Sequence, residues 1–65
     1  MNVTSYYIHP KFTNKYKCCI EKWCDIKSYS IVEVTENRIL SLNEREFNQF
    51  IDRLLENGWQ KTVDF

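Results

Sequence analysis

The clearest pattern of hydrophobic and polar positions lies between Leu42 and Trp59. Five hydrophobic residues recur there at i, i+3, i+4, i+7 and i+8, the spacing of one helix face: Phe47, Phe50, Ile51, Leu54 and Leu55. Asn43 is a suitable N-cap, with Glu46 three residues later as in a capping box. Gly58 suits the left-handed residue after a helix, and Trp59 is then placed to contact Leu54. The segment predicts an amphipathic helix with both ends marked.

Four shorter segments before this helix are rich in Tyr, Ile, Val and Thr and are separated by turn-forming residues. The expected strands span about residues 3–12, 15–24, 29–35 and 38–42, with turns at 13–14, 25–28 and 36–37. Pro10 cannot donate a ladder hydrogen bond, so the first strand belongs at a sheet edge or carries a bulge near His9. The predicted fold class is α+β, an antiparallel β-meander of three to four strands packed by one C-terminal amphipathic α-helix.

A sheet covered by one helix should be hydrophobic on the covered face and polar on the other, but the second strand departs from this rule. By the two-residue period of a strand, Lys15, Lys17 and Trp23 share the face away from the helix. The third strand carries large hydrophobic residues on both faces in either register. We therefore expect a protein partner to cover the second face, with Trp23 and Tyr29 as its anchors and Lys15 and Lys17 at its rim.

Length and composition indicate a single small folded domain over residues 1–65, since 43% of the residues are hydrophobic and 15% are aromatic. Nine Lys and Arg balance nine Asp and Glu, so the whole chain does not attract nucleic acid or an anionic membrane. Residues 1–27 carry a charge of +3 and residues 28–65 a charge of −3. A chain this short buries only about 60% of its unfolded surface, so a second copy would help, and we expect a homodimer.

The chain holds no hydrophobic stretch near the roughly 18 residues that a transmembrane helix needs, and its first residues do not form a signal peptide. We therefore expect no membrane association and a cytoplasmic location. Three cysteines are an odd number, and Cys18 and Cys19 are adjacent, which is poor geometry for a mutual disulfide. Reduced thiols in a cytosol fit this pattern best.

Residues capable of catalysis or metal binding do not form a recognisable constellation. Cys18, Cys19, Cys24 and His9 are four zinc-type ligands, but adjacent strand residues point to opposite faces, which favours small core thiols instead. His9 is the only histidine, so any Ser-His-Asp or Cys-His mechanism depends on it, beside Pro10. A single glycine excludes a Gly-rich phosphate loop. We predict a protein that is not an enzyme and has no metal and no cofactor.

Two stretches resemble the family of single-stranded DNA-binding transcriptional coactivators, which have a curved four-stranded sheet followed by one helix and pair into dimers. The strand Lys15–Trp23 (KYKCCIEKW) and the strand-to-helix segment Arg38–Leu54 (RILSLNEREFNQFIDRL) are similar to that layout. The resemblance implies that Lys15, Lys17 and Trp23 hold single-stranded nucleic acid, with a base stacked on the aromatic ring and phosphates near the lysines.

The segment Phe50–Gln60 (FIDRLLENGWQ) resembles a helix end in the type II-A anti-CRISPR proteins, small phage-encoded inhibitors that block a CRISPR nuclease with a compact sheet-and-helix domain. The short chain and its content of Asn, Lys and Tyr are typical of a small phage gene. This resemblance implies a phage inhibitor that occludes a host or defence protein in the host cell cytoplasm. We predict that function, and a single-stranded nucleic-acid-binding module is the alternative.

Overall fold

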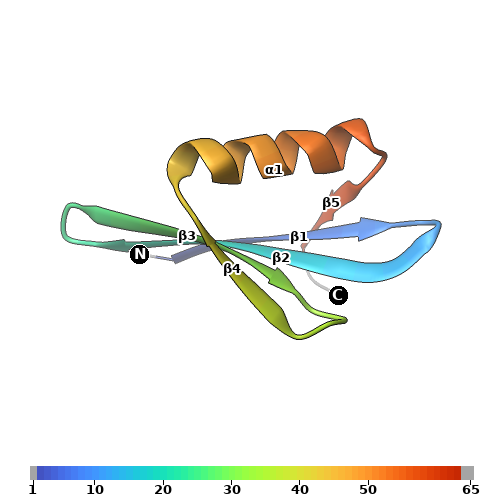
Figure 1. Cartoon of the computed structure of the whole chain (residues 1–65), viewed down its shortest axis with the longest axis horizontal. Helices are drawn as coiled ribbons and strands as arrows, with labels where there is room; N and C mark the ends of the chain where they lie inside the picture. The colour runs from blue at the N-terminus through green and yellow to red at the C-terminus, as the bar shows by residue number, and fades with distance from the viewer. Residues whose placement is uncertain (1, 64–65) are drawn as a thin grey trace.

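The computed structural model describes residues 2–63, which form one five-stranded antiparallel sheet with one helix on one of its faces (Figure 1). The sheet order is β4-β3-β2-β1-β5. In chain order the elements are β1 (Asn2–His9), β2 (Phe12–Trp23), β3 (Ile26–Glu33), β4 (Arg38–Leu42), α1 (Glu44–Glu56) and β5 (Gln60–Thr62). The first four strands form a meander, and after α1 the chain returns to pair β5 with the outer edge of β1.

The structure confirms the α+β class and the meander that precedes the helix, but two turns lie elsewhere and one strand was not expected. The chain reverses at residues 10–11 rather than 13–14, because Pro10 ends the ladder where it has no N–H to donate. It reverses again at residues 24–25 rather than across 25–28. The predicted irregularity near His9 is present as a register shift between Tyr7 and His9. The unexpected strand is β5, which pairs with only three residues of β1.

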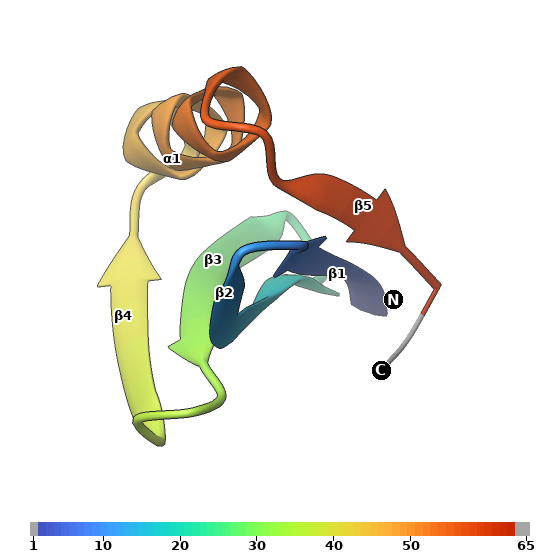
Figure 2. The ribbon, with the colours of Figure 1, turned by 90° about the vertical axis from the view of Figure 1, so that its right-hand side faces the viewer.

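A small core lies between the sheet and α1, which packs over β3 and β4 (Figure 2). Within the described part of the chain, the buried hydrophobic residues are Tyr7, Cys18, Ile31, Phe47 and Leu54. Cys18 and Ile31 are direct cross-strand partners, so they mark one face of the sheet, which we call the covered face. Full burial of such side chains stabilises by about 1.5–3 kcal/mol each, and a chain this short has few of them.

The predicted capping box at the start of α1 is present. The Asn43 side chain accepts a hydrogen bond from the Glu46 N–H at 2.8 Å, and the Asn43 N–H donates to the Glu46 carboxylate at 3.2 Å. Both bonds satisfy N–H groups that have no partner inside the helix. α1 is 13 residues long, and within residues 2–63 no helix has the length and the apolar character needed to cross a membrane.

The end of α1 is the predicted Schellman motif. The Gly58 N–H donates to the Leu55 carbonyl at 3.3 Å, and the Trp59 N–H donates to the Leu54 carbonyl at 2.9 Å. Gly58 has φ +90°, which an L side chain rarely adopts, and a Cβ there would lie 3.2 Å from the His9 ring nitrogen Nε2. Glycine is therefore required at this position both by the backbone conformation and by the proximity of His9.

His9 connects the β1–β2 turn to the end of the helix. Its Nδ1 accepts a hydrogen bond from the Lys11 N–H at 3.0 Å, so Nε2 carries the proton and donates to the Asn57 carbonyl at 3.0 Å. The ring also contacts Phe12 and Trp59, with centroids 4.6 and 5.2 Å away. Two polar contacts and two aromatic contacts therefore hold this end of the helix against the hairpin.

The β2–β3 turn contains a strained residue. Trp23 and Ile26 are paired across a two-residue turn, and Cys24 in that turn has φ +55°. Asn37, in the β3–β4 turn, has φ +53°. Asparagine tolerates this left-handed conformation because its side chain bonds locally, whereas cysteine does not share that advantage.

Replacing His9 should separate its polar from its aromatic contribution. We expect His9→Ala to lower the free energy of unfolding by about 2 kcal/mol and His9→Gln by about 1 kcal/mol, because Gln keeps a donor for the Asn57 carbonyl but has no ring. Urea unfolding followed by tryptophan fluorescence measures both values. Equal losses in the two variants would contradict a stabilising role for the ring.

Replacing Cys24 with Gly should relieve the strain in the β2–β3 turn. We expect Cys24→Gly to raise the free energy of unfolding by about 0.5 kcal/mol, the relief of left-handed strain less the greater unfolded-state entropy of Gly. The matched control Asn37→Gly should change stability less, since Asn is already tolerated there. Cys24→Ala controls for loss of the thiol, and thermal unfolding compares all three. A destabilised Cys24→Gly protein would rule out strain at this turn.

Candidate functional site

The face of the sheet away from α1, which we call the uncovered face, is defined by cross-strand pairing. One row of paired residues runs across four strands and consists of Tyr6, Lys17, Val32 and Ile39. A neighbouring row consists of Thr4, Cys19, Ser30 and Ser41. Both rows are one residue out of phase with the buried pair Cys18 and Ile31, so they lie on the uncovered face. The small polar row divides the hydrophobic side chains of this face into two groups.

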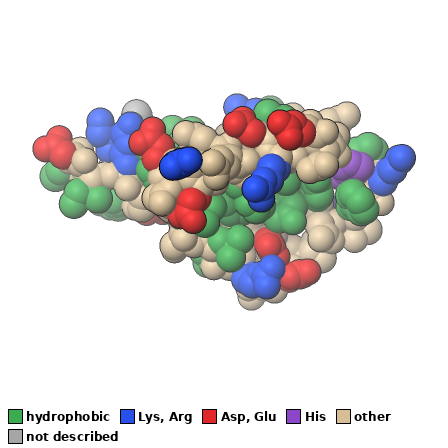
Figure 3. Space-filling view, turned by 45° about the horizontal axis from the view of Figure 1, so that its top comes forward, with side chains coloured by type: hydrophobic (Ala, Val, Ile, Leu, Met, Phe, Trp, Pro, Cys, Tyr) green, Lys and Arg blue, Asp and Glu red, His purple; other side chains and the backbone are tan. Residues whose placement is uncertain are grey.

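The first hydrophobic group lies on a projecting arm formed by the ends of β2 and β3. Every residue from 21 to 28 is exposed, and the hairpin extends beyond the helix in Figure 1 and forms a narrow projection in Figure 3. Trp23 and Ile26 are direct cross-strand partners there, 67% and 72% exposed. Both are out of phase with the buried pair, so the arm presents an indole and an aliphatic side chain together on the uncovered face.

The second hydrophobic group lies at the other end of the same face. Ile39 is 67% exposed and is paired with the partly buried Val32, and Val34 nearby is also exposed. Ile26 and Val32 are six residues apart on β3, which corresponds to about 20 Å along a strand. A standard protein interface buries about 800 Å² on each partner, a patch wide enough to include both groups.

Tyr29 does not lie where the sequence predicted it. It was expected to share the uncovered face with Trp23, but its ring packs against the core, with the Phe47 ring centroid 5.2 Å away. The two-residue turn pairs Trp23 with Ile26, and Tyr29 is three residues beyond Ile26, so it faces the opposite way. Its proposed anchoring role is therefore withdrawn, and Ile26 stands beside Trp23 instead.

Lys15 and Lys17 lie on the uncovered face, as their phase in β2 predicted. Lys17 is directly paired with Tyr6, and its ammonium nitrogen is 6.0 Å from the centre of the Tyr6 ring. That separation is at the outer limit of a cation–π contact. The Lys15 carbonyl accepts a hydrogen bond from the Val34 N–H at 2.9 Å, which brings the lysine beside the second hydrophobic group. The face thus combines exposed hydrophobic side chains with two lysines.

Ile26 and Ile39 were not among the sequence-predicted site residues, although the sequence contained a signal for each. Ile39 alternates with Leu40 and Leu42, and Leu42 is tied to the covered face because it leads into the helix cap. Ile26 was assigned to a turn, so the alternation of strand residues was not used to place it on a face of the sheet. The correct bounds of the β2–β3 turn would have identified Ile26, and the phase of Leu42 would have identified Ile39.

The three thiols lie in three different environments. Cys18 is buried, Cys19 is partly buried on the opposite face and Cys24 is exposed in the arm. Burial and, to a smaller extent, the neighbouring Cys19 together raise the pKa of the Cys18 thiol to about 12. Among residues 2–63, no group of three His, Cys, Asp or Glu side chains is arranged to hold a metal ion.

The Cys18 thiol should make stability fall at high pH. Its folded pKa of about 12 exceeds the ordinary value of 9.0, so above pH 9 the unfolded chain releases a proton that the folded chain keeps. We expect the free energy of unfolding to fall by about 2 kcal/mol more in the native protein than in Cys18→Ala between pH 9 and pH 11. Burial raises the pKa values of Tyr7 and Tyr16 in both proteins and cancels, whereas the smaller contribution of Cys18 to the pKa of Tyr7 is lost in the variant and adds to the difference. Urea unfolding at a series of pH values measures the free energy of unfolding of both proteins. If that free energy fell equally with pH in the two proteins, the buried thiol would not be protonated as described.

No protein-family model, no curated protein and no solved structure matches this chain. A function can therefore be inferred only from the arrangement of its own residues. The arrangement that stands out is an uncovered sheet face with two separated hydrophobic groups and two lysines.

Proposed function

We propose that this protein is a non-enzymatic binding protein that occludes the surface of another protein with its uncovered face. The observation that carries the proposal is the exposed pair of Trp23 and Ile26 on a projecting arm. Two adjacent hydrophobic side chains in water are unfavourable, and exposed hydrophobic groups of this kind mark interaction surfaces.

The energetics favour the arm as the centre of the interface. Burial of a large hydrophobic side chain stabilises by about 1.5–3 kcal/mol, and tryptophan is among the residues most enriched at interface centres. Trp23 and Ile26 are already held side by side by strand pairing, so little side-chain ordering is needed on binding. The group around Ile39 then enlarges the contact at the other end of the face.

The charges of the uncovered face indicate what the partner carries at its rim. Lys15 and Lys17 lie beside the second hydrophobic group, next to Val34 and Val32, while the net charge of the whole chain is zero. Attraction is therefore local rather than long-range, and it favours acidic side chains opposite the lysines. The lysines contribute orientation and association rate more than affinity.

The states of the candidate catalytic groups support binding rather than catalysis. Both His9 ring nitrogens are engaged, one with the Lys11 N–H and the other with the Asn57 carbonyl. A thiol with a pKa of about 12, as in Cys18, is protonated at neutral pH and is a poor nucleophile. Neither group is poised for acid–base or nucleophilic chemistry.

The finer interpretation is that the partner is a host or defence protein, such as a CRISPR nuclease, and that the chain is a phage inhibitor. That interpretation rests on the resemblance of Phe50–Gln60 and stays a prediction. A homodimer also stays a prediction, since a second copy is another occupant of the same face.

A single-stranded nucleic-acid-binding module is the second candidate function. The observation that favours it is that Lys17 lies beside the partly exposed Tyr6 ring on the same face as Trp23, because lysines interleaved with aromatic rings bind phosphates and stacked bases. The even balance of acidic and basic residues weighs against it, since phosphate attraction dominates such binding.

Photo-crosslinking in the cells that naturally express the chain tests the protein-binding proposal. A benzoyl-phenylalanine in place of Ile26 should form a covalent adduct with one partner protein, and the same group in place of the exposed helix residue Gln49 should not. Once mass spectrometry has identified the partner, Trp23→Ala should raise the dissociation constant of the complex by about 30-fold or more, which is the loss of affinity expected at an interface centre. Leu55→Ala, which removes an exposed hydrophobic group on α1, is the matched control and should change affinity little.

The other outcomes of these measurements are distinct. Binding of an oligo-dT strand that weakens steeply with salt and requires Lys15 and Lys17 would replace the proposal with the second candidate. A dimer in sedimentation velocity that Ile39→Glu dissociates would assign the face to a second copy. Equal crosslinking from both positions, or full affinity in Trp23→Ala, would overturn the choice of Trp23 and Ile26.

A further inference from the structure

The outer edge of β1 is only half paired. β5 pairs with Tyr6, Tyr7 and Ile8, and within residues 2–63 no strand pairs with the same edge between Asn2 and Ser5. In an antiparallel ladder, alternate residues direct both their N–H and their C=O toward the same neighbour. Two of these four residues therefore present two groups each to the open side, a total of four backbone hydrogen-bonding groups.

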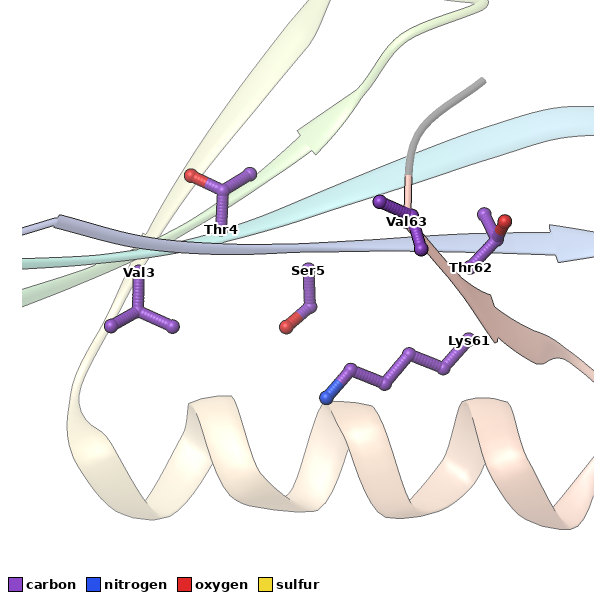
Figure 4. Close-up of a pocket in the computed structure, with 6 residues that line it drawn as sticks. All are labelled: Val3, Thr4, Ser5, Lys61, Thr62 and Val63. Atoms are coloured by element: carbon purple, nitrogen blue, oxygen red, sulfur yellow. The ribbon is translucent and has the colours of Figure 1, made fainter.

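A hollow of about 600 Å³ lies beside this open edge, lined by Val3, Thr4, Ser5, Lys61, Thr62 and Val63. In Figure 4, Val3 and Ser5 point from β1 toward α1, and Thr4 points the other way. Because the lining residues come from both faces of β1, the hollow lies in the plane of the sheet. That is the position in which the next strand of the sheet would run.

β5 does not fill this position. It pairs antiparallel with β1 from Gln60 opposite Ile8 to Thr62 opposite Tyr6, and the chain then bends at Val63, which is 89% exposed. The strand thus ends where the open edge of β1 begins. An incoming strand in line with β5 would continue the sheet without displacing any described element.

We infer that the open edge of β1 is a strand-addition site for an extended segment of a partner protein. The segment runs antiparallel to β1, in line with β5, and its backbone bonds to the outward groups between Asn2 and Ser5. Such β-augmentation takes its affinity from main-chain hydrogen bonds and its specificity from alternate side chains in adjoining hollows. The volume of the hollow is within the usual range for a binding site, about 300–1,000 Å³.

The side chains of β1 and β5 that point toward α1 indicate which residues the partner segment should carry. Lys61 extends from β5 into the gap between β1 and α1 (Figure 4), and it has no carboxylate partner among the described residues. Lys61 is paired with Tyr7, and Ser5 is the next residue of β1 on the same face as Tyr7. A residue opposite Ser5 therefore lies beside the ammonium group and should be acidic.

Val3 sets the second preference. It is 49% exposed and lies two residues before Ser5 on the same face of β1. A residue opposite Val3 should therefore be aliphatic, because the pair would then remove hydrophobic surface from water on both sides. In the direction of β5, the recognised sequence is an acidic residue, any residue and an aliphatic residue.

This site goes beyond the proposed function, since it lies at the sheet edge rather than on the uncovered face. Trp23 and Ile26 take no part in it, and Val3 and Lys61 take no part in the uncovered face, because both point toward α1. Substitutions at the two surfaces therefore test the two inferences separately.

The test uses the full chain, labelled with ¹⁵N, and the acetylated and amidated peptide Glu-Thr-Val-Thr-Thr, which begins opposite Ser5 because β5 occupies the positions opposite Tyr6 and Tyr7. At millimolar peptide we expect amide shifts confined to Asn2–Ser5 and Lys61–Val63, with slower hydrogen exchange at the outward N–H groups of β1. The matched peptide with Lys in place of Glu should bind about fivefold more weakly, the size of a surface charge reversal, and Lys61→Glu should invert this preference. Trp23→Ala should bind the peptide as the native chain does.

Three outcomes overturn the inference. The first is the absence of shifts at Asn2–Ser5 at millimolar peptide, or shifts confined to the uncovered face. The second is unchanged binding of a peptide N-methylated at Glu and at the following Thr, because one of those two N–H groups must point at β1. The third is protection of the same amides that rises with protein concentration in the absence of peptide, which would identify the occupant as a second copy.

Discussion

The structure depends on one constraint, that a single helix covers only one face of a five-stranded sheet. Strand pairing has a period of two residues, so each strand residue belongs either to the small core or to the uncovered face. Cys18 and Cys19 illustrate the constraint, since adjacent residues of the same type are respectively buried beneath α1 and directed away from it. The proposed binding face and the distribution of thiols both follow from this division.

The same constraint explains why the ends of the helix are so fully bonded. The buried core is small, and partly buried side chains such as Phe50 and Ile51 extend its contact with the sheet. The capping box at Asn43, the Schellman motif at Gly58 and the two hydrogen bonds of His9 supply specific contacts at both ends. The capping box and the Schellman motif fix where α1 begins and ends, the bond from His9 to Asn57 joins its C-terminal end to the hairpin, and ring contacts such as Phe47 with Tyr29 hold it on the sheet.

Sequence reasoning was accurate where the signals are local and failed where they are not. The helix, its N-cap and its C-terminal motif are encoded within a few residues each, and all were predicted. The placement of Tyr29 depended on its phase relative to Trp23 across the β2–β3 pairing, which sets Tyr29 opposite Ile20 and on the covered face, and this long-range pairing was not worked out from the sequence. β5 has the sequence QKT, which carries no alternation, and it is a strand only because the β1 edge is beside it. Lys61 was missed for the same reason.

The arm that carries Trp23 and Ile26 has a consequence for the lifetime of a complex. Within residues 2–63, the strand pairing of residues 22–27 is between β2 and β3 alone, so we expect the arm to open locally more readily than the rest of the sheet. A partner that binds the arm would also restrict the motion of its backbone, and part of the contact energy would be lost to that ordering. Stiffness of the hairpin, rather than the area of its contact, then sets how long the two molecules remain together.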